Sequence, residues 1–164
     1  MIDCLSVIDQ RPQLPGWVRP LSKLIIFLQR LGIAFFSFHV LSIPGRRSGL
    51  MRTTVVSPFT VAGERYLLSF GQLDWVRNAR AAGWGILRRG RREERVVLAE
   101  MKPPSGARIV GEFPKQIPAG VQFFIRMGFV DSPGRSDQFE AAVDKLALFR
   151  VDRAQAPSGA SATT

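Results

Sequence analysis

The 164-residue chain has few of the side chains that metal sites and nucleophilic enzymes use: it contains one cysteine, one histidine and one tyrosine. The single Cys4 rules out a disulfide framework and a cysteine-based zinc site, and it favours a reducing, intracellular compartment. The single His39 lies in an apolar, strand-like run, so a structural histidine is a better interpretation than a Ser-His-Asp triad. We predict no metal site.

Acidic residues are also scarce, with 13 against 23 basic residues and a net charge of +10. This surplus favours an anionic partner, which would be a nucleic acid, an acidic membrane surface or a small polyanionic ligand, or else it simply keeps the surface soluble. A secretory signal is not evident, and the apolar segment 24–43 is interrupted by Gln29, Arg30, Gly32 and His39. We therefore expect a cytoplasmic protein.

The length predicts a single domain with its own core. We expect a flexible N-terminus over 1–18, one domain over 19–152 and a disordered tail over 153–164, which is rich in Ala, Ser, Gly and Thr. A helix is predicted over 20–31, since Pro20 suits its first turn and Gly32 its end. Its apolar stripe would pack on the core or lie at a membrane interface, helped by nearby basic residues.

The remaining pattern is mainly β with flanking helices, the α+β class. Strands are predicted over 36–43, 51–61, 65–70, 84–89, 92–101 and 148–151, and helices over 73–82, 119–127 and 137–146. The last helix is placed by Asp137-Gln138-Phe139-Glu140, which has the form of a capping box. Because the strands follow one another through short turns, the pattern indicates a small, mostly antiparallel barrel.

The most informative segment is the polar break Gly45-Arg46-Arg47-Ser48-Gly49-Leu50-Met51-Arg52. Such a loop presents backbone N–H groups and fixed positive charge to one small volume, which suits a multiply charged anion. It is not a phosphate-binding P-loop, because it lacks the glycine spacing and the lysine followed by serine or threonine. The alternative is a hairpin connection whose charges are solvated.

Two further segments carry clustered polar residues. In 74–80, Asp74 and Asn78 share a helix face and Trp75 lies three residues before Asn78. An aromatic ring beside an amide suits a conjugated, polar ligand, although on spacing alone a core tryptophan is the commoner outcome. The basic run 88–95 includes two glutamates and a turn at Gly90, which favours a solvated hairpin tip over a nucleic-acid site. No nucleic-acid partner is expected.

The segment 45–54, followed by Trp75 and Asn78 on the next helix, resembles the signature of the deazaflavin-dependent nitroreductase family. These are actinobacterial oxidoreductases related to the FMN-binding pyridoxamine phosphate oxidases, and the resemblance covers roughly 20–151. It implies a split β-barrel and coenzyme F-420, an 8-hydroxy-5-deazaflavin with a phosphate and an oligoglutamate tail; FMN is the alternative cofactor. It also implies hydride transfer from reduced F-420 to an electron-poor acceptor, such as a quinone or a nitro compound.

The same resemblance implies where the cofactor would bind. The residues concerned are Arg47, Ser48, Gly49, Arg52, Thr54, Val55, Val56, Trp75 and Asn78. The loop residues would hold the phosphate and the tail, the backbone of 54–56 would line the ring, and the two helix residues would complete the pocket. No catalytic side chain is named, because the hydride chemistry belongs to the cofactor.

The chain departs from the characterised nitroreductase branch in its aromatic residues. That branch has several tyrosines around the acceptor, whereas the only tyrosine here is Tyr66 and the C-terminal part carries Phe123, Phe124, Phe129 and Phe139. Apolar walls without a proton donor favour a hydrophobic quinone, and helix 20–31 would bring the protein to the inner face of the plasma membrane. Alternatives are a non-catalytic deazaflavin- or flavin-binding protein and a basic nucleic-acid-binding domain. Homodimerisation is a further expectation.

Overall fold

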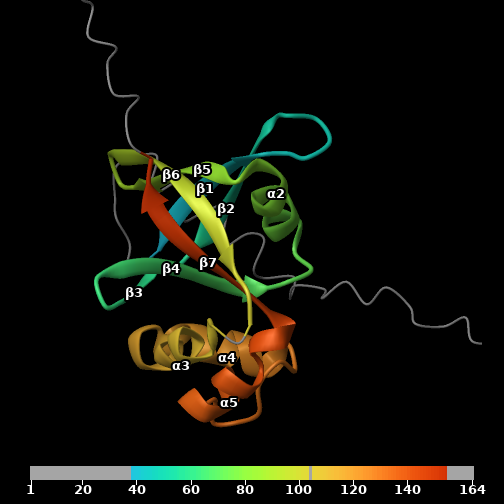
Figure 1. Cartoon of the computed structure of the whole chain (residues 1–164), viewed down its shortest axis with the longest axis vertical. Helices are drawn as coiled ribbons and strands as arrows, with labels where there is room; N and C mark the ends of the chain where they lie inside the picture. Colours follow the sequence, from blue (N-terminus) through green and yellow to red (C-terminus); the bar gives the residue numbers. More distant parts are fainter. Residues whose placement is uncertain (1–37, 104, 155–164) are drawn as a thin grey trace, which may run out of the picture.

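The computed structural model describes residues 38–103 and 105–154 (Figure 1). In this part of the chain seven antiparallel strands form one sheet in the order β2-β1-β5-β6-β7-β4-β3. The strands are β1 (His39–Pro44), β2 (Met51–Val56), β3 (Phe59–Val61), β4 (Glu64–Phe70), β5 (Trp84–Arg89), β6 (Arg92–Met101) and β7 (Leu146–Arg153). The helices are α2 (Asp74–Ala82), α3 (Ala107–Gln116), α4 (Pro118–Arg126) and α5 (Ser136–Ala141), with a 3-10 turn η1 (Val143–Lys145).

The sheet curls because its two edge strands are neighbours in the sequence. β2 and β3 lie at opposite edges, yet only Ser57 and Pro58 separate them. So short a connection spans about 10 Å, which brings the two edges together at that point. The result is the predicted split β-barrel of the α+β class. The single strand predicted over 51–61 is wrong, because Pro58 has no N–H for a ladder and the chain changes partner there from β1 to β4.

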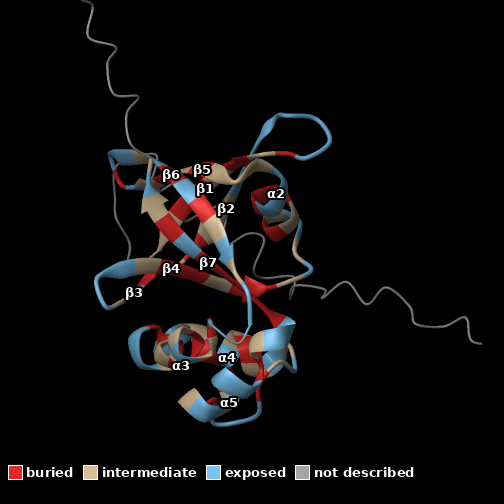
Figure 2. Ribbon diagram, in the orientation of Figure 1, coloured by how far each residue is buried: buried red, intermediate tan, exposed pale blue. Residues whose placement is uncertain are grey.

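Two apolar cores lie on either side of β4 and β7 (Figure 2). The barrel core is closed by Val76 and Ala79 of α2 and comprises Leu41, Ile43, Val56, Leu67, Val76, Ala79, Leu87, Val96, Leu98, Ala147, Phe149 and Val151. The second core is rich in phenylalanine and lies between the sheet and the layer of α3, α4 and α5 that gathers beneath β3 and β4. Tight apolar packing on both faces fixes β7 and so holds the barrel against the helices.

Helix α2 and the hairpin of β5 and β6 match their predictions closely. α2 ends at Gly83, whose φ of 70° is a left-handed conformation that glycine adopts without strain, and its N–H donates to Ala79 O at 2.8 Å. β5 and β6 occupy the predicted ranges 84–89 and 92–101. The short turn between β3 and β4 consists of Ala62 and Gly63.

The C-terminal half departs further from prediction. Helix α3 was not predicted, and α5 ends at Ala141 where a helix to Leu146 was expected. The N-cap of α5 is Arg135 and not Asp137, two residues later. The N–H of Arg135 donates to the side-chain oxygen of Gln138 at 2.7 Å. β7 begins at Leu146 because that residue is buried against the helices, and it runs through Arg153, beyond the predicted end at Val151.

Three predicted segments lie largely outside the described residues: the N-terminal region 1–18, the helix over 20–31, and the tail from 155 onward. Helix α4 agrees with the prediction of a helix over 119–127. Among the helices of the described residues, none has the length and apolar character that a membrane crossing requires.

Candidate functional site

The loop between β1 and β2, residues 45–50, is closed by its own hydrogen bonds. Gly45 N–H donates to Leu50 O at 2.9 Å, and Gly49 N–H donates to Gly45 O at 2.8 Å. Gly49 has a φ of 68°, and Leu50 N–H points to Ser48 Oγ at 3.4 Å. The loop therefore has a defined shape, and it projects from the barrel beside α2 (Figure 1).

One arginine ties this loop to α2. The backbone N–H of Arg46 donates to Asn78 Oδ1 at 3.2 Å, and its Nη1 donates to the same oxygen at 3.0 Å. Its Nη2 lies 3.1 Å from Asp74 Oδ1. Asn78 is only 5% exposed, whereas the Asp74 side chain is 83% exposed. The buried amide oxygen is therefore the main anchor of the loop, and the exposed ion pair adds little.

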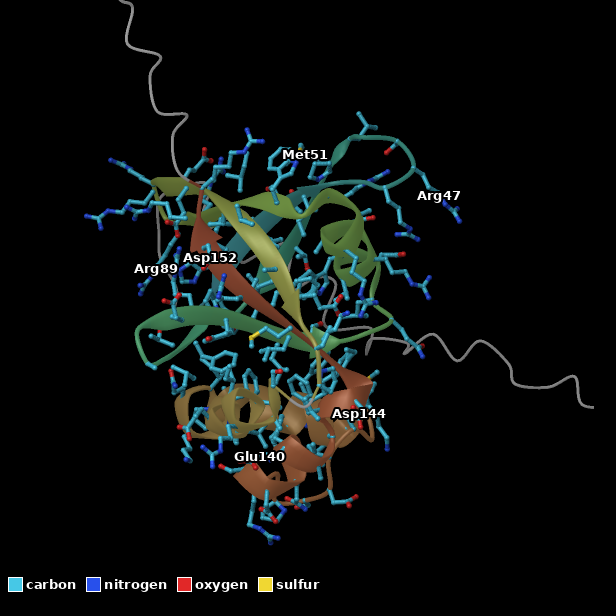
Figure 3. All side chains as sticks on the ribbon, viewed as in Figure 1. Arg47, Met51, Arg89, Glu140, Asp144 and Asp152 are labelled. Atoms are coloured by element: carbon cyan, nitrogen blue, oxygen red, sulfur yellow. The ribbon has the colours of Figure 1, made fainter. Side chains whose placement is uncertain are left out.

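The two other arginines of the loop region are differently placed. Arg47 and Arg52 are both exposed, and neither side chain forms a hydrogen bond or an ion pair within residues 38–103 and 105–154. Figure 3 shows Arg47 at the outer tip of the loop, directed away from the body of the protein. The site thus presents two cations whose charge the described part of the protein does not neutralise, which suits an anion.

Glycine at position 45 allows two of the predicted residues to approach each other. A Cβ atom at Gly45 would lie 3.3 Å from Ser48 Oγ, 3.5 Å from Arg52 Cγ and 3.2 Å from Leu50 O. The hydroxyl of Ser48 and the stem of Arg52 therefore converge on the space that this glycine leaves open. Ser48 and Arg52 form one group, and Arg47 lies further out on the same loop.

Residues 54–56 lie on a sheet edge. In the described part of the chain β2 pairs with β1 only, so alternate backbone groups of β2 point away from the sheet. Thr54 and Val56 pair with Leu41 and His39, while Val55 pairs with Val40 on the other face. The three side chains therefore do not share a face, and a ligand at this edge would meet only the outward-pointing backbone groups of the segment.

The opposite edge of the sheet is covered. The side-chain amide of Gln116 in α3 accepts a hydrogen bond from Thr60 N–H at 3.0 Å and donates one to Thr60 O at 2.6 Å. One glutamine thus satisfies both backbone groups of the central residue of β3. The open backbone lies at β2, next to the loop.

Trp75 belongs to the barrel wall. Its ring lies 5.8 Å from that of Phe149, and the side chain is half-buried against the barrel core. A core role, the alternative considered from spacing, therefore accounts for a large part of this side chain. The part of the Trp75 side chain that stays exposed lies on α2, the helix that also carries Asn78.

The far side of α2 is fixed to β6 by a second arginine. Arg80 donates from Nε to Glu100 Oε2 at 2.8 Å, from Nη2 to Glu100 Oε1 at 2.6 Å and from Nη1 to Gly71 O at 2.8 Å. The hydrogen bond to Glu100 raises the pKa of Arg80 above its ordinary value. Two arginines thus hold α2 between the loop and the sheet, while the side chain of Arg77 on the same helix has no partner among the described residues.

The basic hairpin of β5 and β6 is largely engaged with itself and with its neighbours. Arg88 pairs with Glu93, and Glu94 accepts from Arg65 and, at 3.3 Å, from Arg153. The Arg65 hydrogen bond is the main reason that the pKa of Glu94 lies below its ordinary value. Within the same described segments, no group of three His, Cys, Asp or Glu side chains is arranged to hold a metal ion.

Arg46 and Asp74 are the residues of this site that sequence reasoning did not include. The sequence placed Asp74 and Asn78 on one helix face and associated that segment with a conjugated, polar ligand. It did not indicate that Arg46, and not its neighbour Arg47, would donate to both side chains, because that choice depends on how the loop turns.

Comparison with known proteins supports the fold and leaves the family open. No family model matches the chain, and no curated protein does. A solved structure described as a domain-swapped dimer has a TM-score of 0.53 at 13% identity, over 83% of this chain and 97% of that one. A putative pyridoxamine 5'-phosphate oxidase from Listeria innocua has a TM-score of 0.48 at 10% identity, over 82% and 94% of the two chains. An F-420-H2-dependent reductase has a TM-score of 0.44 at 11% identity, over 71% and 95%.

Proposed function

We propose that the protein is an oxidoreductase that binds coenzyme F-420 between the loop and β2 and passes a hydride to an electron-poor, apolar acceptor such as a quinone. One observation carries the proposal: the side chains of Arg47, on the loop that Arg46 fixes to α2, and of Arg52, at the start of β2, are exposed and without partners in the described part of the chain. Charged side chains held in place before a ligand arrives are typical of a binding site.

The residues present fit the charged end of this cofactor. Phosphate and carboxylate groups are bound well by the planar fork of arginine, and a polyanionic tail needs more than one such fork. Arg47 and Arg52 offer two, and the hydroxyl of Ser48 and the loop backbone around Gly49 offer further hydrogen bonds. FMN carries a single phosphate, which one arginine would satisfy, so the pair of arginines favours F-420 and leaves FMN as the second candidate.

The ring would lie along the β2 edge at Thr54, Val55 and Val56, with Trp75 of α2 completing the pocket, whereas the side-chain oxygen of Asn78 is already occupied by Arg46. When bound in its reduced form, F-420 supplies the hydride. The protein contributes position, positive potential near the anionic groups and apolar surroundings that exclude water. We assign no catalytic side chain.

The proposal of an apolar acceptor is supported by exposed apolar side chains near the loop, and not by the C-terminal phenylalanines. The C-terminal phenylalanines are packed in the second core, where Phe124 is 4% and Phe139 is 0% exposed, so these two do not line an open site. Leu50 and Met51, by contrast, are 65% and 43% exposed directly beside Arg52. Exposed apolar side chains of this size next to a binding loop suit contact with an apolar molecule. Membrane association through 20–31 and homodimer formation remain proposals from the sequence.

Titration of the protein with oxidised F-420 and with FMN, followed by turnover of reduced F-420 with menadione, tests the proposal. We expect F-420 to bind at least about tenfold more tightly than FMN, the difference that one charge-assisted contact supplies, and the oxidised cofactor's absorbance to recover with menadione. F-420 binding without recovery would establish the alternative, a non-catalytic carrier. Tighter binding of FMN, or binding of neither, would refute the assignment of F-420.

A further inference from the structure

Two consecutive arginines of the loop have opposite surroundings. Arg46 makes contacts to α2 through its backbone N–H, its Nη1 and its Nη2. Arg47 makes none within the described residues and points outward at the loop tip (Figure 3). The side-chain hydrogen bonds that join the loop to α2 in this part of the chain all involve Arg46.

We infer that Arg46, Asn78 and Asp74 form a brace, with Asn78 as a positioning residue that acts on an anionic ligand through Arg46 and not by direct contact. The role of the brace in ligand binding rests on the proposed function. The mechanical role, holding the loop on α2, stands on the contacts alone.

Asn78 is the central member of the brace. Its Oδ1 accepts both Arg46 donors and is shielded from water, since the residue is 5% exposed. Removing this oxygen would leave a backbone N–H and a guanidinium group facing a site without an acceptor, which costs more than losing an exposed contact. Asp74 is exposed, so water replaces most of what its carboxylate provides.

The internal hydrogen bonds of the loop set its shape but not its orientation. The bonds from Gly45 to Leu50 and from Gly49 to Gly45 close the loop on itself. Orientation relative to the barrel comes from the brace, and it determines where Arg47, Ser48 and Arg52 point. A loop already oriented loses less conformational freedom when it binds an anion, so the brace would raise affinity for the charged part of a ligand without touching it.

Amide hydrogen exchange on the ligand-free protein tests the brace itself. For Asn78→Ala we expect exchange at Arg46, whose N–H donates to Asn78 Oδ1, to accelerate about tenfold or more, the scale of one lost buried acceptor. Asn78→Asp keeps an oxygen at the same distance and should restore protection. Arg80→Gln is the matched control, because it releases α2 from Glu100 without touching the loop. Protection of the Gly83 amide reports that α2 is intact in each variant.

Unchanged exchange in the loop of Asn78→Ala, with Gly83 still protected, would overturn the brace. Equal acceleration in Arg80→Gln would overturn it as well, since it would show a general loosening of α2.

A binding experiment tests the link to the ligand. The probes are F-420 and the same deazaflavin without its phosphate and tail. We expect Asn78→Ala to weaken F-420 binding about tenfold and to leave the tail-less compound unchanged, because the loop meets only the charged part. An equal loss for both compounds would show that Asn78 touches the ring, and would overturn its role as a positioning residue. If F-420 does not bind the unmodified protein, the proposed function fails while the exchange result still decides the brace.

Discussion

Replacing Arg52 with alanine should weaken F-420 binding while leaving the fold intact. The side chain of Arg52 is exposed and forms no hydrogen bond or ion pair within residues 38–103 and 105–154, so its loss should change the free energy of unfolding by no more than about 0.5 kcal/mol. A contact between its guanidinium and a phosphate or carboxylate is worth about 1.5–3 kcal/mol. The dissociation constant should therefore rise by about 10- to 150-fold.

The assay is a titration of the cofactor's fluorescence at fixed ionic strength, with urea unfolding as the check on stability. Arg92→Ala is the matched control, because Arg92 is likewise an exposed arginine without a partner in the described segments, at the β5–β6 turn. At about 0.1 M salt a charge beyond about 10 Å is largely screened, so this variant should bind like the wild type. Arg52→Lys should be intermediate, since it keeps the charge and loses the fork.

Two results would refute the reasoning. An affinity of Arg52→Ala within about twofold of the wild type, well short of the tenfold that a charge-assisted contact predicts, would remove Arg52 from the site. A comparable loss in Arg92→Ala would show that the ligand responds to the overall charge of +10 and not to this loop.

Three further predictions concern stability. Gln116→Ala should lower the free energy of unfolding by about 1 kcal/mol in urea titration, because β3 loses both hydrogen bonds at Thr60; an unchanged midpoint would show that water replaces them. Glu94 has its pKa held below the ordinary value, chiefly by the hydrogen bond from Arg65, so its stabilising contribution is present above that ordinary value and is lost as pH falls from there through the lower pKa of the folded state. Thermal melts of Glu94→Gln should therefore depend less on pH between about 5 and 3, and identical pH profiles would contradict this. Phe139→Ala, at a fully buried position, should destabilise by about 3–5 kcal/mol in the same urea assay, and a loss below 1 kcal/mol would mean that the second core is loosely packed.

The sequence was informative where local signals and tertiary needs agree. Gly83 ends α2, and Gly90 lies in the turn between β5 and β6. In both places the glycine adjoins a segment whose apolar pattern matches the helix or strand that forms. Helix α3 escaped prediction because its glycines and Pro114 mark a break in any local reading. The structure shows their purpose: a Cβ at Gly111 would collide with the side chain of Glu140 in α5, and one at Gly106 would lie 2.9 Å from Leu148 Cδ2. Close helix packing, invisible in the sequence, outweighed helix propensity.

For the candidate site, the contacts between elements were not readable from the sequence. The loop joins β1 to β2 and is hydrogen-bonded to Asn78 of α2. Arg46 and Arg47 are adjacent arginines in the sequence. The conformation of the loop directs Arg46 toward α2 and Arg47 toward solvent. Asn78 was predicted to touch the cofactor, but its amide oxygen is already occupied by Arg46.

The two edges of the sheet give an independent reason to place the ring at β2. An unpaired strand edge invites pairing with another chain, and proteins usually cover it or charge it. Here the β3 edge is covered by Gln116, whose amide meets both backbone groups of Thr60. Within the described residues no side chain covers the β2 edge in this way. The exposed Arg52 lies near the start of that strand. A charge at this position hinders edge-to-edge pairing and attracts an anion at the same time. Under the proposed function, the open edge of β2 would hold the flat ring and Arg52 would hold part of the charged tail attached to it.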